Sequence, residues 1–288
     1  MIKLKEFIRL ITPPIFVHAY HGYKAGRISY STANLNAYRQ LNADSRTSEI
    51  TLRPAIRLNI LPECKIPFEY FCYRDDECVQ EMDCFLALAR DKSRFLDVGA
   101  LYGVFSLAFT TQQKDGRALA VEPSTAAFPS LLYNIHKNPD CHVRALDMAL
   151  SDRDGTIDMR LDWKHLVAAG ASGASKDDCI SIASRTGDSL CSAEEFRPDL
   201  IKIDVEGYEY ECLRGLTQTI DDNRPTIFLE LHPELLKSHG HLTADIAEYF
   251  RQKSYQCLDL QRRPIPLSFI EKATQICRLF LRPMETAH

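Results

Sequence analysis

The sequence lacks every pattern that is typical of a disulfide framework or a zinc site. Its ten cysteines include no CxxC pair and no cysteine–histidine cluster at metal-ligand spacing. Most of them lie within apolar, periodic segments, where a free cysteine behaves as a small hydrophobic residue. The cysteine usage therefore predicts a reduced protein in the cytoplasm.

Long hydrophobic runs and a strong excess of one charge are also missing. No stretch approaches the roughly 18 consecutive apolar residues that a transmembrane helix requires. The N-terminal residues are interrupted by Arg9 and by the pair Pro13 and Pro14, unlike a secretory signal peptide. A net charge of -4 gives no electrostatic basis for binding nucleic acid. The sequence argues against a membrane-spanning protein and against a nucleic-acid partner.

Residues 1–69 are expected to form an N-terminal extension of a helix and irregular or strand-like segments. An apolar face at residues 2–11 predicts a short amphipathic helix, which docks on the protein itself or contacts a membrane surface peripherally. Residues 20–50 show no strong period and are expected to be loops. Short strands are expected from residue 49 onwards, the last at residues 68–73.

Residues 70–265 alternate between strand and helix patterns and form the main domain. After a helix capped by Asp75 or Asp76, buried strand patterns recur at 95–98, 118–121, 143–150, 199–204 and 226–232. A helical pattern follows each of them except the third, which is followed by a turn and a returning strand. This alternation predicts an α/β fold with a doubly wound, mostly parallel sheet. An apolar stripe in the remaining segment, 266–288, predicts a C-terminal amphipathic helix.

The segment FLDVGALYG, residues 95–103, is a strand that ends in an acid and a glycine-punctuated turn. Gly99 permits a tight turn, and Gly103 lets the next helix lie close to the strand. This is not the dinucleotide fingerprint, because Asp97 stands where the first glycine would be. A carboxylate there repels a pyrophosphate but suits an ammonium group, such as the one in S-adenosylmethionine.

A second acid, Glu122, ends the next strand. It is placed to accept hydrogen bonds from both hydroxyls of a ribose, as acids at this position do in nicotinamide enzymes. Glu122 alone therefore indicates a nucleoside, and its pairing with Asp97 favours the methyl donor. The segment from Ala149 to Asp152, at the end of the third strand pattern, is expected to pass beside the adenine.

Two further strand ends carry candidate catalytic groups. Asp204 and Glu206 follow one strand, and Glu230 and His232 end the next. Because residues i and i+2 share a face of a strand and parallel strands end at one edge, these groups are expected to converge. A hydroxyl acceptor benefits from a base, and His232 has the unperturbed pKa nearest neutrality. An alternative is a divalent cation held by Asp204, Glu206 and Glu230.

The motifs FLDVGALYGVFS, AVEPS, MALSDRDGTI, DLIKIDVEGYE and LELHPE resemble those of the FkbM family of methyltransferases. One departure is Gly187, between Thr186 and Asp188, where the family has leucine. The resemblance implies a class I methyltransferase (Rossmann-like) fold with a seven-stranded sheet. It also implies O-methylation of a hydroxyl on a sugar, glycoconjugate or polyketide-like acceptor.

The expected site contains no metal ligand and uses S-adenosylmethionine. The expected cofactor-binding residues are Asp97, Gly99, Tyr102, Gly103, Glu122, Pro123, Ala149 and Asp204. The expected catalytic residues are Asp204, Glu206 and His232. Two other functions stay open: N-methylation of a small molecule or peptide, and a catalytically silent binding subunit.

Overall fold

The core of the protein is an eight-stranded, mostly parallel sheet. The computed structural model describes residues 30–44, 46–162, 165–168 and 179–284. The strand order is β13-β12-β14-β11-β10-β3-β4-β5. The strands are β3 (Arg94–Val98), β4 (Arg117–Val121), β5 (Val143–Leu146), β10 (Leu200–Ile203), β11 (Thr226–Leu231), β12 (Tyr255–Leu258), β13 (Pro264–Ile265) and β14 (Cys277–Pro283).

The topology of this sheet confirms the predicted fold class. Strands β5, β4, β3, β10 and β11 are parallel, and β14 runs antiparallel to both β11 and β12. The order reverses between β3 and β10, so the sheet is doubly wound and its switch point lies there. The seven long strands make the class I methyltransferase (Rossmann-like) sheet, to which β13 adds a two-residue edge.

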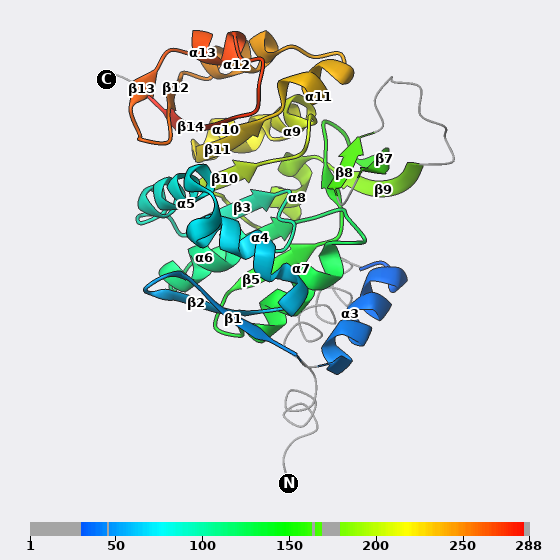
Figure 1. The fold of residues 1–288 in the computed structure, drawn as a ribbon. Coiled ribbons are helices and arrows are strands. Elements are labelled where there is room, and N and C mark those ends of the chain that lie inside the picture. The colour runs from blue at the N-terminus through cyan, green and yellow to red at the C-terminus, as the bar shows by residue number, and fades with distance from the viewer. Residues whose placement is uncertain (1–29, 45, 163–164, 169–178, 285–288) are drawn as a thin grey trace.

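Helices cover both faces of the sheet (Figure 1). One face packs against α5 (Asp76–Leu88), α6 (Val104–Gln112) and α7 (Phe128–Lys137). The other face packs against α8 (Gly187–Ala193), α9 (Glu209–Gly215), α10 (Thr217–Asn223) and α12 (Thr243–Gln252). Two short helices, α11 (Pro233–Ser238) and α13 (Ser268–Glu271), complete this half. Because both faces are covered, β10 and β11 are buried along their whole length.

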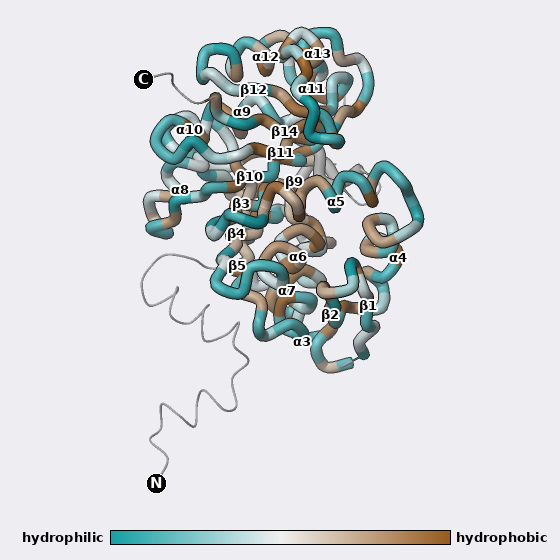
Figure 2. The backbone as a smooth tube through the Cα atoms, turned by 90° about the vertical axis from the view of Figure 1, so that its left-hand side faces the viewer, coloured by the Kyte–Doolittle hydropathy of each residue, from teal (hydrophilic) through white to brown (hydrophobic). Residues whose placement is uncertain are grey.

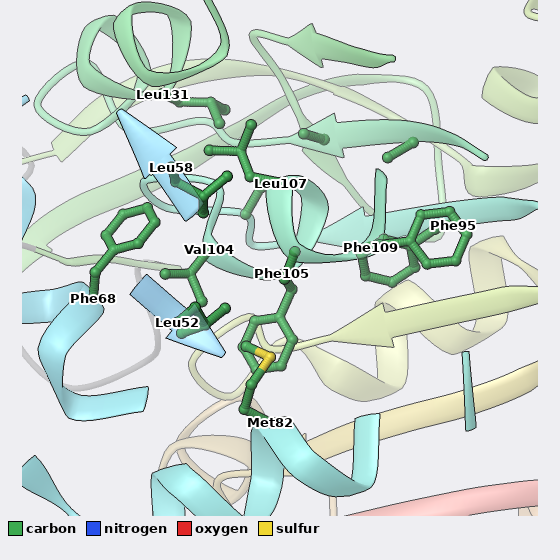
Figure 3. Packing of buried hydrophobic residues seen from close by; sticks show 14 of the residues in the cluster. Leu52, Leu58, Phe68, Met82, Phe95, Val104, Phe105, Leu107, Phe109 and Leu131 are labelled. Atoms are coloured by element: carbon green, nitrogen blue, oxygen red, sulfur yellow. The ribbon is translucent and has the colours of Figure 1, made fainter. Parts of the chain in front are cut away.

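The core is apolar, and hydrophobic residues concentrate along the central strands (Figure 2). On the face covered by α5, α6 and α7, the rings of Phe105 and Phe85 meet edge to face at 4.9 Å, and those of Phe95 and Phe109 lie 5.3 Å apart. Figure 3 shows Phe105 reaching from α6 toward Met82 of α5. Aromatic pairs at these separations add to the stability gained by burial.

A second sheet of four strands lies beside the ends of the central strands (Figure 1). Its order is β6-β9-β7-β8, formed by β6 (Ala149–Leu150), β9 (Cys179–Arg185), β7 (Gly155–Asp162) and β8 (His165–Ala168). Strand β7 alternates buried Ile157 and Met159 with exposed Thr156 and Asp158. One face of β7 therefore turns toward the main body of the protein.

The N-terminal extension corrects two expectations. Helix α3 (Thr32–Asp44) occupies part of the expected loop at 20–50. The first expected short strands are present as β1 (Ser48–Arg53) and β2 (Ile56–Ile60), which pair antiparallel. The strand expected at 68–73 is wrong, because this stretch is helical: Pro62–Cys64, α4 (Lys65–Glu69) and a π-helical turn at Tyr70–Arg74. Its short apolar run fits either state, and Phe68 is buried at helical spacing. The helix predicted at 2–11 lies outside the described residues.

The predicted C-terminal helix is also wrong. After α13 the chain forms β14, which enters the sheet between β11 and β12 and buries Leu279, Phe280 and Leu281. Hydrogen bonding to both β11 and β12 stabilises the strand conformation, although the apolar residues of the segment recur at helical spacing. A boundary at residue 265 would therefore cut through the sheet. Within the described ranges, no helix has the length and apolar character to cross a membrane.

Candidate functional site

A cavity opens at the carboxyl ends of the strands beside the switch point, where doubly wound sheets bind ligands. We call it the switch-point cavity. It has a volume of about 110 Å³ and is bounded by the ends of β3, β4 and β10 and by β6 and β7. Lining residues from these elements include Val98, Gly99, Leu101, Val121, Glu122, Pro123, Ser124, Ala149, Leu150, Ile157, Met159, Asp204, Val205, Glu206 and Tyr208.

The turn after β3 requires glycine at its centre. Gly99 has φ +82°, a left-handed conformation, and a Cβ there would lie 1.8 Å from the carbonyl oxygen of Asp204. The N–H groups of Gly99 and Ala100 both donate to the carbonyl of Val121. The turn thus ties together the ends of β3, β4 and β10 and leaves its backbone at the cavity wall.

Glu122 lies at the cavity wall, held by the backbone around it. Its Oε2 accepts a 2.8 Å hydrogen bond from the N–H of Leu101, and its Oε1 accepts one of 2.7 Å from Ser124. Burial raises the pKa of Glu122 to about 7, although these two donors act to lower it. Its remaining lone pairs can accept hydroxyl groups from a ligand.

Three of the expected cofactor residues, Asp97, Tyr102 and Gly103, do not line the cavity. Asp97 is buried toward α6, where its Oδ2 accepts a 2.6 Å hydrogen bond from the hydroxyl of Ser106. Burial raises the pKa of Asp97, while nearby Lys202 acts against this. Tyr102 packs against the core, and its carbonyl accepts a hydrogen bond from Asn134.

Asp204 and Glu206 both line the cavity, in the turn that follows β10. Asp204 Oδ2 accepts a 2.7 Å hydrogen bond from the ammonium of Lys202. Although burial acts to raise it, Lys202 and His232 hold the pKa of Asp204 below its usual value. Glu206 has φ +52°, and Gly207 after it has φ +97°. A left-handed glutamate is strained, and such strain is concentrated at functional sites.

His232 lies behind these acids and does not line the cavity. Its Nδ1 is 2.8 Å from Oε1 of Glu209, and its Nε2 is 3.5 Å from Oε2 of Glu206. Burial acts to lower the pKa of His232, but Glu209, Asp204 and Glu206 together raise it to about 9. His232 is therefore an imidazolium at neutral pH.

A buried ionic network continues from Asp204 through the sheet. Lys202 is almost fully buried, and its ammonium lies 4.9 Å above the ring of Phe105. Arg278 of β14 is within 2.9 Å of Glu81 and within 2.8 Å of Glu230. Burial raises the pKa of Glu81 to about 8 and of Glu230 to about 7.

The sequence interpretation missed several of these contacts. Glu209 belongs to the quoted motif DLIKIDVEGYE but was given no role, because its contact with His232 depends on how α9 meets β11. Glu81 and Arg278 lie on distant segments of the chain with no shared motif. The sequence gives one signal of the network: Lys202 stands within an otherwise apolar strand pattern, two residues before Asp204.

Among the residues that the structure describes, one group of side chains has the spacing of a metal site. Asp204, Glu230 and His232 each offer a ligand atom within 4.8 Å of the others. However, Lys202 is paired with Asp204 and Arg278 with Glu230. A divalent cation among these carboxylates would face two positive charges at close range, the buried ammonium of Lys202 and the half-buried guanidinium of Arg278.

The chain resembles known methyltransferases. Residues 97–257 match the methyltransferase FkbM domain. The hexuronic acid methyltransferase AglP of Haloferax volcanii is 26% identical over 167 residues, which cover 55% of this chain and 67% of that protein.

Two solved structures are also similar. The FkbM methyltransferase of Methylobacillus flagellatus gives a TM-score of 0.45 at 16% identity, over 86% of this chain and 58% of that one, so this chain spans less than two thirds of it. The O-methyltransferase TomG of Streptomyces achromogenes, in complex with SAM, gives 0.43 at 9% identity over 94% and 96%. The family match covers more than half of this chain and includes the acids at the ends of β3, β4 and β10. The chain therefore belongs to the FkbM family and is an S-adenosylmethionine-dependent methyltransferase.

Proposed function

We propose that this protein methylates a hydroxyl group of a sugar, glycoconjugate or polyketide-like acceptor. The observation that carries the proposal is the meeting of Glu122, Asp204 and Glu206 at one cavity beside the switch point. Glu122 suits the ribose of a nucleoside, and the other two suit an incoming hydroxyl. The relative that acts on hexuronic acid supports a sugar acceptor.

The residues around the cavity fit an adenosyl ligand. Gly99 gives a backbone approach without a side chain, Glu122 offers carboxylate oxygens, and Pro123 with Ala149 gives an apolar wall. Asp97, Tyr102 and Gly103 support the turn from behind. The cavity is smaller than the roughly 300 Å³ typical of ligand sites, so binding has to widen it.

S-adenosylmethionine supplies an electrophilic methyl group when it is bound. Asp204 and Glu206 are assigned to orient the acceptor hydroxyl and to take its proton, because they line the cavity. His232 is assigned a supporting role, since as an imidazolium it has no free lone pair to act as a base. This replaces the interpretation of His232 as the base. Transfer to nitrogen would need neither carboxylate.

We propose that the site works without a divalent cation. Lys202 and Arg278 already neutralise the carboxylates that would bind one. We also propose a cytoplasmic location, which the nine free thiols among the described cysteines support.

Calorimetry with S-adenosylhomocysteine tests the proposal. The wild-type chain is expected to bind it, and Glu122→Ala is expected to weaken binding about 10- to 100-fold, because a hydrogen bond to a charged group is worth about 1.5–3 kcal/mol. Exposed Glu49 gives a matched control, Glu49→Ala, with unchanged affinity. Absence of binding to the folded wild-type protein would refute the proposed function.

A further inference from the structure

A second hollow adjoins the switch-point cavity, and we call it the polar groove. Its volume is about 510 Å³, within the range of small-molecule sites. It lies between the turn that leads into β7, helix α9 and the segment after α11. Ile157 and Tyr208 line both hollows, so the groove and the cavity meet at these two side chains.

Strand β7 forms the partition between the two spaces. Its buried residues Ile157 and Met159 line the switch-point cavity, whereas its exposed residues Thr156 and Asp158 line the groove. The alternation of side chains along a strand produces this division. Tyr208 stands at the other side of the junction, where its hydroxyl is 3.3 Å from the hydroxyl of Ser151.

The groove differs from the cavity in chemistry. Ile157 is the single aliphatic residue among the ten that line it. Two of its acids already have partners: Asp152 lies 3.4 Å from Arg214, and Glu211 lies 3.0 Å from His241. These pairs fix carboxylates and a guanidinium in place while leaving some of their hydrogen-bonding positions open.

Such a surface suits a ligand with many hydroxyl groups. Carboxylates accept hydrogen bonds from hydroxyls, and a guanidinium donates to hydroxyl and ring oxygens. The ring of Tyr208, which meets that of His239 edge to face at 5.7 Å, adds an apolar face to a polar wall. An apolar acceptor would displace water from these groups without replacing its hydrogen bonds, which costs affinity.

We propose that the polar groove is the acceptor site and that it binds a sugar ring, whose reacting hydroxyl enters the switch-point cavity past Ile157 and Tyr208. This inference deepens the proposed function and rests on it. It narrows the acceptor from the wider class of sugars, glycoconjugates and polyketides to a hydroxyl-rich one. Neutral and acidic sugars share this chemistry, and the test separates them.

The test measures sugar binding by saturation-transfer NMR on the full chain saturated with S-adenosylhomocysteine. The probes are methyl glucoside, glucuronic acid and, as an apolar acceptor, a phenol. Thr156→Trp fills the groove from β7, and Thr51→Trp places the same bulk on an exposed strand position elsewhere. Asp158→Trp is a second blocking variant in case the first fails to fold. Calorimetry with S-adenosylhomocysteine is repeated on each variant.

At least one sugar is expected to bind the wild type and Thr51→Trp. In the blocking variants Thr156→Trp and Asp158→Trp, the affinity for that sugar should fall at least about tenfold. Their affinity for S-adenosylhomocysteine should change less than about twofold. If glucuronic acid binds more strongly than methyl glucoside, the acceptor is assigned as an acidic sugar. If the two bind equally, the acceptor is assigned as a neutral sugar. The inference is overturned if no sugar binds, if the phenol binds better, or if the blocked variants bind sugar as well as Thr51→Trp does. Loss of S-adenosylhomocysteine binding by the wild type would instead contradict the proposed function.

Discussion

At the scale of single residues, Glu209 affects the candidate site although it does not line the cavity. It is fully buried on α9, and its Oε1 lies 2.8 Å from Nδ1 of His232. A proton held on Nδ1 by this carboxylate leaves Nε2 turned toward Glu206. Glu209 thus acts as a positioning residue for His232 and, through it, for the acids that line the cavity.

Replacing Glu209 by glutamine is expected to lower the pKa of His232 from about 9 toward its usual value. The carboxylate is the strongest of the partners that favour the charged ring, and an amide cannot replace its charge. NMR titration of the histidine ring protons measures this shift. The control is Glu211→Gln on the same helix, which touches His241 instead. An unchanged pKa of His232 in Glu209→Gln would show that Glu209 does not hold the proton.

The same contact predicts how stability depends on pH. The pKa of His232 is higher in the folded protein, about 9, than its ordinary value near 6.5. Its contribution is therefore fully present below pH 6.5 and is lost as the pH rises through 9. Urea unfolding is expected to show this decline in the wild type and a smaller one in His232→Gln. A wild-type stability that rises over this interval, with no smaller slope in the variant, contradicts the prediction.

Single residues also show what a sequence can predict about the site. Glu122 and Asp204 reach the cavity because each directly follows a strand, and the ends of these strands meet at one edge of the sheet. Glu206 lies two residues further on, in the turn after β10. Asp97 misses it because it lies within β3, on the same face as Phe95, and turns toward α6. The alternation of side chains along β3 predicts that Asp97 shares a face with Phe95. Which face of the strand meets the ligand depends on how the whole sheet packs, and the sequence of one strand does not contain this.

At the scale of elements, the turn after β3 depends on the absence of one side chain. Gly99 and Gly240 both have left-handed φ values, +82° and +84°. A Cβ on Gly99 would collide with the backbone of Asp204, just after β10, whereas nothing lies within 4 Å of a Cβ on Gly240. The two positions therefore separate the conformational cost of alanine from its steric cost.

Gly99→Ala is expected to destabilise the protein by at least about 3 kcal/mol and to abolish S-adenosylhomocysteine binding. Gly240→Ala is expected to cost only about 1 kcal/mol, the price of a left-handed alanine, and to bind normally. Urea unfolding and calorimetry measure the two effects. Similar losses in both variants would mean that the close approach at Gly99 has no special importance.

Strand β14 carries Arg278, a cation that contacts two buried acids. Removal of Arg278 leaves Glu81 and Glu230 without that partner, so Arg278→Met is expected to destabilise the protein by about 3 kcal/mol at pH 9. At pH 5 the loss should be smaller, because both acids, with pKa values raised to about 8 and 7, are then neutral. Arg282→Met, at an exposed position of β14, is the control. A loss independent of pH would show that the arginine acts by packing alone.

The C-terminal elements mark the limit of periodicity as a guide. The segment that forms β14 has an apolar stripe at helical spacing, and its strand conformation follows from the gap between β11 and β12. At residues 68–73 the opposite error occurs: the sequence predicts a strand, but the segment is helical. Its apolar alternation is too short to exclude a helix. Long elements with caps, such as α5 after Asp75, were predicted well.

At the scale of the whole molecule, one network of charges joins the sheet, α5 and the cavity. Because Lys202 and Arg278 already pair with its carboxylates, Mn²⁺ at millimolar concentration is expected to leave the melting temperature unchanged, and so is a chelator. Differential scanning calorimetry measures this. A clear rise in melting temperature with Mn²⁺ would show that the Asp204–Glu230–His232 group takes a metal.

The position of β14 also has a consequence for synthesis on the ribosome. Residues 277–283 enter between two strands that are translated earlier, so β11 and β12 cannot be joined until those residues have left the exit tunnel. Until then the nascent chain exposes an open strand edge and the buried acids lack their arginine. The emergence of β14 therefore determines when this open strand edge is covered and the nascent chain is protected from aggregation.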